Sequence, residues 1–162
     1  MSTARAHHRF TVNEGAMRSK ADEPAQDIAS RMGHSEPMLR VIAMPADANP
    51  SGDIFAGWLL WQMDLAGGSL AERRALGRCT TVAVNSAVFD EPVIVGDEIS
   101  CYCEIAETGR TSLVVRIEAW RRPRASEELR KVTEATFTYV AIDEDRSPRP
   151  LPPAVEATKG RS

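Results

Sequence analysis

Apolar and polar residues alternate along four stretches of the chain, and this alternation is typical of half-buried β-strands. The four stretches are residues 79–89, 98–107, 112–122 and 130–142. A shorter apolar run over residues 38–45 is ended by a proline and predicts one more strand before them. Short loops, such as the turn Thr108-Gly109-Arg110, join several of these strands and therefore favour an antiparallel sheet.

One further segment is apolar almost throughout. Residues 54–70 read IFAGWLLWQMDLAGGSL, in which Gln62, Asp64 and Ser69 are the polar positions. A helix that is apolar on nearly all sides is expected to be buried. One buried helix and one long antiparallel sheet predict an α+β fold, in which the curved sheet wraps around a single central helix.

The residues around this helix predict its limits and its packing. Ser51 or Asp53 is expected to cap its start, and the helix is expected to end near Gly77. Gly67 and Gly68 lie inside it and cost about 1 kcal/mol each relative to alanine. Such glycines predict the close approach of another backbone.

The chain divides into a folded unit and two tails. Residues 1–36 hold few large apolar residues without periodicity, and residues 146–162 contain four of the ten prolines, so both are expected to be flexible. The folded unit is predicted over residues 37–145, which is the size of one ordinary domain. The first tail is balanced in charge and the second carries +3; since the whole chain carries −3, the folded unit carries −6.

Composition and charge exclude several classes of protein. With 43% apolar and 27% charged residues, the chain resembles an average soluble domain. Its net charge of −3 argues against a nucleic-acid binder held by bulk electrostatics. No apolar run reaches the roughly 20 residues that a membrane span needs. The N-terminal segment has no apolar run typical of a secretory signal, so we expect a cytoplasmic protein.

The cysteines and histidines do not predict a metal centre. Cys79, Cys101 and Cys103 form an odd set, which is typical of reduced thiols, and the last two are expected on one face of a strand. Zinc usually takes four ligands, and the three histidines all lie in the N-terminal tail. We therefore expect no metal and no separate cofactor.

Two polar residues near the apolar helix are candidates for chemistry. Asp64 is expected in a mostly apolar environment, where it either has a structural role, facing a wet seam or pairing with an arginine, or acts as a general base or nucleophile. Asn49 lies in the loop before the helix and either makes a local turn or orients a water or carbonyl group. Backbone N–H groups at the helix start, near Gly57, are candidates for stabilising an oxyanion.

The segment LRVIAMPADANPSGDIFAGWLLWQMDLAGG resembles the signature of hotdog-fold acyl-CoA thioesterases, closest to the short single-domain bacterial acyl-CoA hydrolases. Further similar motifs are VAV at 82–84, PVIVGD at 92–97, GRTS at 109–112, EAW at 118–120 and TEATFTYVAID at 133–143. The chain departs from the family pattern at Ser51, Ala56 and Asn85.

The resemblance implies the hotdog fold and hydrolysis of acyl-CoA to a free fatty acid and CoA. It also implies a catalytic pair, Asn49 and Asp64, that acts across a dimer interface with one residue from each subunit. Such dimers commonly assemble into a trimer of dimers, so a hexamer is expected.

CoA is strongly anionic, so its capture by a unit of charge −6 requires local positive charge. Seven of the eleven Lys and Arg residues in the folded unit lie between positions 110 and 131. We expect the phosphates to be bound by Arg110, Thr111, Ser112, Arg121 and Arg122.

The alternative to an enzyme is a non-catalytic hotdog module that binds acyl-CoA as a sensor. A hotdog dehydratase is disfavoured because the folded unit has no histidine.

Overall fold

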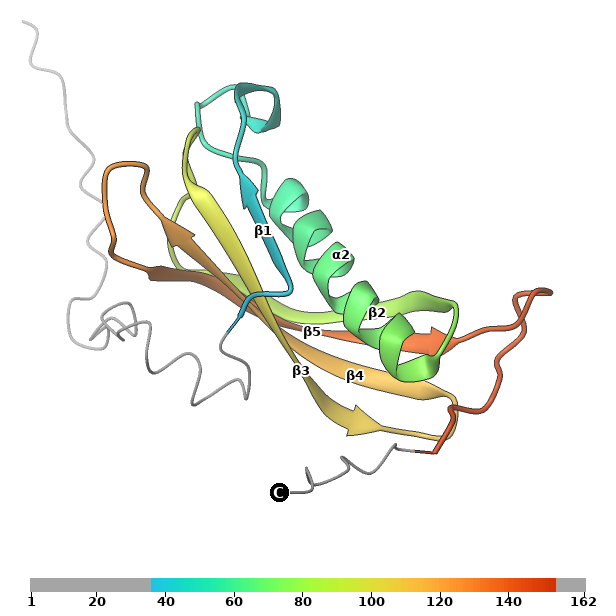
Figure 1. The fold of residues 1–162 in the computed structure, drawn as a ribbon. Coiled ribbons are helices and arrows are strands. Elements are labelled where there is room, and N and C mark those ends of the chain that lie inside the picture. Colours follow the sequence, from blue (N-terminus) through green and yellow to red (C-terminus); the bar gives the residue numbers. More distant parts are fainter. Residues whose placement is uncertain (1–35, 154–162) are drawn as a thin grey trace, which may run out of the picture.

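The structure is a computed structural model that describes residues 36–153; the remaining parts of the two predicted tails lie outside the described residues. A long helix, α2 (Ala56–Ala75), lies against the concave face of a curved sheet (Figure 1). The strands are β1 (Leu39–Ile42), β2 (Cys79–Phe89), β3 (Glu98–Thr108), β4 (Ser112–Arg122) and β5 (Arg130–Ala141), and a short 3-10 helix, η2 (Pro45–Asp47), follows β1. The predicted order of strand, helix and four strands is confirmed.

The sheet is antiparallel, with the strand order β1-β3-β4-β5-β2. Alternate residues of β4 enter the core below the helix, namely Leu113, Val115, Ile117 and Ala119. They pack in one cluster with Met63 and Ala66 of α2. The order leaves β2 at one edge of the sheet, paired with β5 alone.

The start of α2 differs from the prediction. Phe55 is the N-cap residue and makes no side-chain capping bond. The side-chain oxygen of Asn49 instead accepts hydrogen bonds from the backbone N–H groups of Ser51 and Asp53. Because both predicted caps are held in this turn ahead of the helix, neither reaches its first N–H groups. The helix ends at Ala75, two residues before Gly77.

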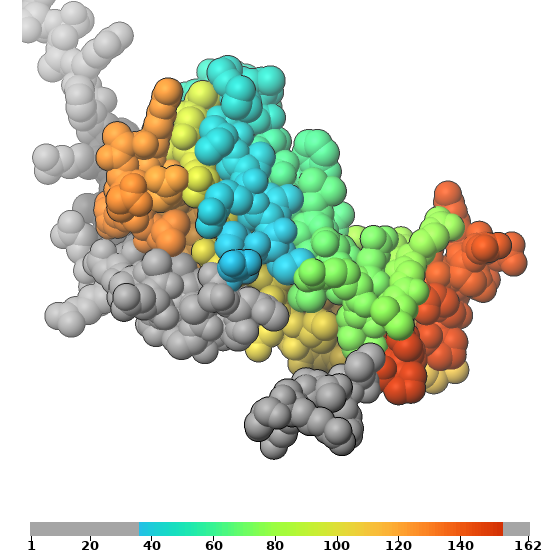
Figure 2. Space-filling model, viewed as in Figure 1, coloured from blue at the N-terminus to red at the C-terminus, as the bar shows by residue number. Residues whose placement is uncertain are grey.

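One face of α2 has no cover within the described chain. Trp61 and Leu65 are 58% and 48% exposed. Figure 2 shows the helix surface open between β1 and the segment that contains β2. The prediction of a helix buried on all sides is therefore wrong for a single chain, since only the side toward the sheet is buried.

Gly67 marks a close approach between α2 and side chains of the sheet. A Cβ atom at this position would overlap the hydroxyl of Tyr139 and the end of Ile117. The predicted close contact therefore exists, but side chains of the sheet make it, where the sequence suggested another backbone. At Gly68 the nearest atom would be a ring carbon of Tyr139 at 3.8 Å, an ordinary contact.

The folded unit extends beyond the predicted limit at residue 145. Arg149 donates hydrogen bonds to the carbonyl oxygens of Ala75 at 2.9 Å and Ile142 at 3.2 Å, so it caps the end of α2. Leu151 donates its backbone N–H to the carbonyl of Arg110. Residues 146–153 thus belong to the folded unit, although their prolines suggested a flexible tail.

The described residues include no helix whose length and apolar content suit a membrane span.

Candidate active site

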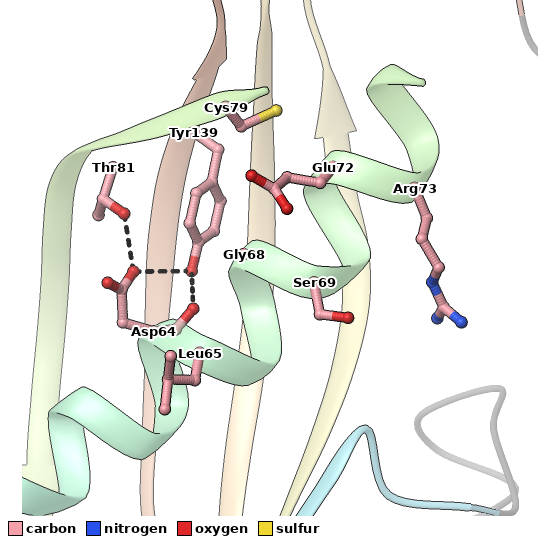
Figure 3. A pocket seen from close by; sticks show the side chains of 9 residues that line it. All are labelled: Asp64, Leu65, Gly68, Ser69, Glu72, Arg73, Cys79, Thr81 and Tyr139. Atoms are coloured by element: carbon pink, nitrogen blue, oxygen red, sulfur yellow. Dashed lines mark hydrogen bonds between the residues drawn. The ribbon is translucent and has the colours of Figure 1, made fainter. Parts of the chain in front are cut away.

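Asp64 lies halfway along α2 on a half-buried face that points toward β2 and β5. Its Oδ1 atom accepts hydrogen bonds from Thr81 Oγ1 at 2.7 Å and from the Tyr139 hydroxyl at 3.1 Å (Figure 3). The Oδ2 atom makes no hydrogen bond within residues 36–153. One carboxylate oxygen is therefore fixed by two hydroxyl groups, and the other is available to a ligand.

A pocket of about 540 Å³ opens beside this carboxylate. Its lining residues come from α2, β2 and β5 (Figure 3): Asp64, Leu65, Gly68, Ser69, Glu72, Arg73, Cys79, Thr81 and Tyr139. This volume lies within the range of small-molecule sites, and its walls combine apolar surface with a few polar groups. No lysine or arginine of residues 36–153 pairs with Asp64, and its carboxylate faces this pocket. Its role in catalysis stays a prediction.

Burial raises the pKa of two further groups at the site, Tyr139 and Cys79. Burial, followed by the nearby charge of Asp64, raises the pKa of Tyr139 above its ordinary value. Burial and the charge of Glu72 also raise the pKa of Cys79. Both groups therefore stay protonated near neutral pH, and Tyr139 remains a hydrogen-bond donor.

The other two cysteines belong to the core. Cys101 and Cys103 lie on the same side of β3, as predicted, in the cluster beneath α2. Burial raises the pKa of Cys101 to about 12 and also raises that of Cys103. Among the residues that the structure describes, no group of three or more His, Cys, Asp or Glu side chains is placed to hold a metal ion.

Asn49 and Gly57 lie at the start of α2, away from Asp64. The Asn49 Oδ1 atom accepts the two loop hydrogen bonds described above, and its amide nitrogen has no partner within the described chain. Gly57 is exposed in the first helical turn, and a Cβ atom there would meet nothing within 4 Å. Seven residues of helix, about 10 Å along the axis, separate Gly57 from Asp64. One subunit therefore does not bring the three predicted residues to a single carbonyl group.

The arginines predicted for CoA do not form one cluster within a subunit. Arg121 pairs with Glu91 at 2.9 Å and with the buried Asp97 at 3.0 Å. Arg122 pairs with Glu98 at 2.9 Å, and this hydrogen bond lowers the pKa of Glu98. Arg110 lies beyond the opposite end of β4, about 30 Å away, because a strand advances about 3.3 Å per residue.

The hairpin of residues 109–112 lies at the end of β4 whose neighbour on β5 is the pocket-lining Tyr139. Leu113 is paired with Tyr139 across β4 and β5, and Ser112 is paired with Val140. The backbone carbonyls of Arg110 and Thr111 accept hydrogen bonds from Leu151 and Ala141. The hairpin is thus held in place while the Arg110 side chain makes no ion pair within residues 36–153.

Sequence reasoning missed the two residues that contact Asp64. Thr81 lies 17 residues beyond Asp64 in the chain, and Tyr139 lies 75 residues beyond it. The available signal was that each occupies an alternating strand position: Thr81 on β2 and Tyr139 on β5. Without the strand order, nothing placed either residue beside the helix.

Comparisons with known proteins agree with this architecture. The model of the thioesterase superfamily matches residues 51–128. The acyl-CoA thioester hydrolase YciA of Salmonella typhimurium is 50% identical over 120 residues, which cover 72% of this chain and 90% of that protein. A hexameric thioesterase from Yersinia pestis is 46% identical with a TM-score of 0.70, over 72% of this chain and 95% of that one. A hexameric hotdog-fold thioesterase of Campylobacter jejuni is 40% identical with a TM-score of 0.68, over 72% and 90% of the two chains.

A curved antiparallel sheet around one helix, with a carboxylate of that helix facing a pocket, defines a hotdog-fold protein of the thioesterase class. The match to curated relatives is close and covers most of their length. The chain belongs to the hotdog-fold acyl-CoA thioesterase family, as the sequence motifs predicted.

Proposed function

We propose that the protein is a cytoplasmic enzyme that hydrolyses the thioester of acyl-CoA to a free fatty acid and CoA. The observation that carries this proposal is the carboxylate of Asp64, with one oxygen held by two hydroxyl groups and the other free at the pocket. The name of the Salmonella relative, an acyl-CoA thioester hydrolase at 50% identity, supports the substrate class.

Asp64 is the proposed centre of the reaction. Its free Oδ2 atom either takes a proton from the attacking water or attacks the thioester carbonyl directly to form an anhydride. Negative charge then develops on the thioester oxygen. The backbone N–H of Gly57, in the first turn of α2, supplies a donor for that charge because it makes no hydrogen bond within residues 36–153. Asn49 orients the carbonyl or the water.

These groups are proposed to meet across a subunit interface. Within one chain the N-terminal turn of α2 lies about 10 Å from Asp64, too far to contact the same carbonyl group. A second copy that lies antiparallel to the first brings its own helix start beside Asp64. The exposed face of α2, together with the exposed Val82 and Val84 of the edge strand β2, supplies an apolar surface for such a dimer. The hexameric state of the Yersinia and Campylobacter proteins supports assembly of three dimers.

Mixing two inactive variants tests this interface. We expect Asn49→Ala and Asp64→Asn to be nearly inactive separately and to regain about a quarter of wild-type turnover after being unfolded and refolded together. Half of the refolded dimers are then mixed, and each mixed dimer holds one site in which both residues are intact. The measurement is thiol release from acyl-CoA before and after refolding. Failure to regain turnover, when refolded wild-type protein recovers its own, places both residues in one subunit.

CoA is proposed to place its phosphates near the hairpin of residues 109–112. Arg110 is exposed there, and the hydroxyls of Thr111 and Ser112 are close in sequence. Arg121 and Arg122 already neutralise acidic partners at the far end of β4, so their proposed role is to hold the loops of the folded unit.

Arg110→Gln tests the position of the phosphates. We expect the KM for acyl-CoA to rise about fivefold at low ionic strength, with a smaller rise at high salt because exposed charges are screened there. Arg122→Gln is the comparison, for which we expect a KM within about twofold of wild type. Steady-state kinetics at two salt concentrations measure both. An unchanged KM in Arg110→Gln contradicts this assignment without affecting that of Asp64.

Thiol release from a panel of acyl-CoAs of increasing chain length tests the overall proposal. We expect turnover of at least one member, and loss of that turnover in Asp64→Asn. The sensor alternative predicts binding of acyl-CoA, measured by calorimetry, without release at any chain length.

A further inference from the structure

Tyr139 is held in a fixed position between the sheet and α2. Its ring is 2% exposed and stacks on Phe137, with ring centroids 6.3 Å apart. The helix residue above it is Gly67, where any Cβ atom would overlap the Tyr139 hydroxyl. The chain therefore has room for this phenol directly beneath α2 because residue 67 is glycine.

The hydroxyl at the end of this ring contacts the helix at Asp64 (Figure 3). It donates to Oδ1 at 3.1 Å and also lies 3.3 Å from the backbone carbonyl oxygen of the same residue. Thr81 donates to the same Oδ1 atom from the neighbouring strand β2. The Thr81 side chain is exposed and the Tyr139 ring is buried, so the tyrosine is the rigid member of the pair.

We infer that Tyr139 is a positioning residue for the reaction: it holds Asp64 Oδ1 so that Oδ2 points into the pocket. The inference rests on the proposed thioester hydrolysis. A carboxylate that is free to rotate spends part of its time with neither oxygen directed at the substrate, and small displacements of a reacting group cost large factors in rate. A hydrogen bond to the charged form of a carboxylate also stabilises that form.

Tyr139→Phe tests the inference, because it removes one oxygen atom and keeps the ring. We expect kcat to fall about tenfold, the usual effect of losing one hydrogen bond to a charged group. The KM for acyl-CoA stays within about twofold, since the phenol supports the carboxylate and not the bound CoA. The acid limb of the kcat/KM profile is expected to move to higher pH, because an anion with one donor fewer is protonated more easily.

The chain supplies a matched control in its second tyrosine. Tyr102 is 6% exposed and packs against Trp120 in a separate cluster, so Tyr102→Phe also removes a buried hydroxyl. We expect its kcat and its acid limb to equal those of wild type. Thermal unfolding of both variants reports any general loss of stability.

A second variant keeps the test decisive if Tyr139→Phe fails to fold. In the Tyr102→Phe background Tyr139 is the remaining tyrosine, so 3,5-difluorotyrosine can be incorporated there during expression. Fluorine makes the phenol a stronger donor, and we expect the acid limb to move to lower pH. The inference is overturned by a wild-type profile in Tyr139→Phe or in the fluorinated protein, or by equal effects of the two Phe substitutions. If the wild-type protein releases no thiol from any acyl-CoA, the proposed function itself fails.

Discussion

Asp64→Asn is expected to reduce kcat for acyl-CoA hydrolysis by a factor of about 10² to 10⁴, the usual contribution of a positioned base. The amide has the same shape as the carboxylate and still accepts hydrogen bonds from Thr81 and Tyr139. It is not a base at neutral pH and is a poor nucleophile, so both mechanisms open to Asp64 are lost together. Binding of acyl-CoA is expected to persist. Thiol release for kcat and calorimetry for binding measure the two quantities separately.

Glu72→Gln is the control for this substitution. Glu72 is a second carboxylate on the same pocket, but it is exposed and has no place in the proposed chemistry. We expect its turnover to remain within about threefold of wild type. Near-normal turnover in folded Asp64→Asn, or an equal loss in both variants, contradicts the assignment of Asp64.

Val84→Asp is expected to dissociate the proposed dimer and to lower turnover by about two orders of magnitude. Val84 is 47% exposed on the edge strand β2 in a single chain. A carboxylate at this position loses its hydration when two β2 edges meet, and an unpaired buried charge is costly. A separated subunit retains Asp64 but loses the partner's helix start. Sedimentation velocity measures the assembly, and thiol release measures the site.

Leu76→Asn is the matched control for an exposed apolar side chain. Leu76 is 73% exposed just after α2, outside the edge strand β2, with a φ of 50°. Asparagine tolerates this left-handed backbone better than most residues, so the fold is expected to be unaffected. We expect wild-type assembly and turnover. A fully active, smaller species of Val84→Asp contradicts a site shared between subunits.

Local patterns predicted the elements of the fold accurately. Residues 79–89 and 112–122 alternate in polarity, and the structure has strands over the same residues, Cys79–Phe89 and Ser112–Arg122. Residues on one side of a strand or helix recur at a fixed spacing, so the buried side can be recognised as a repeating pattern of apolar residues in the sequence. This pattern does not identify what packs against the exposed side of α2. Asp64 was singled out because a carboxylate in an apolar helix is costly, an argument that needs no tertiary information.

Features that depend on distance in space were predicted less well. Arg110 and Arg121 are close in sequence, but an extended strand separates them, so a cluster of arginines along the chain is not a cluster in the fold. Tyr139 is remote in sequence from Asp64 and contacts it. Prolines after residue 145 suggested a flexible tail, whereas Arg149 anchors that segment to the helix end through hydrogen bonds.

The contact between Arg149 and the end of α2 has a consequence for the order of events during protein synthesis. The carbonyl of Ala75 receives its guanidinium partner from a residue 74 positions later. The edge strand β2 likewise pairs with β5 within the sheet. This pairing therefore cannot form until residues 130–141 have left the ribosome. Until then the nascent chain exposes an apolar helix and an unpaired strand, which is the condition under which chains aggregate. Native structure is therefore expected to form late in synthesis, once residues 130–149 have been made.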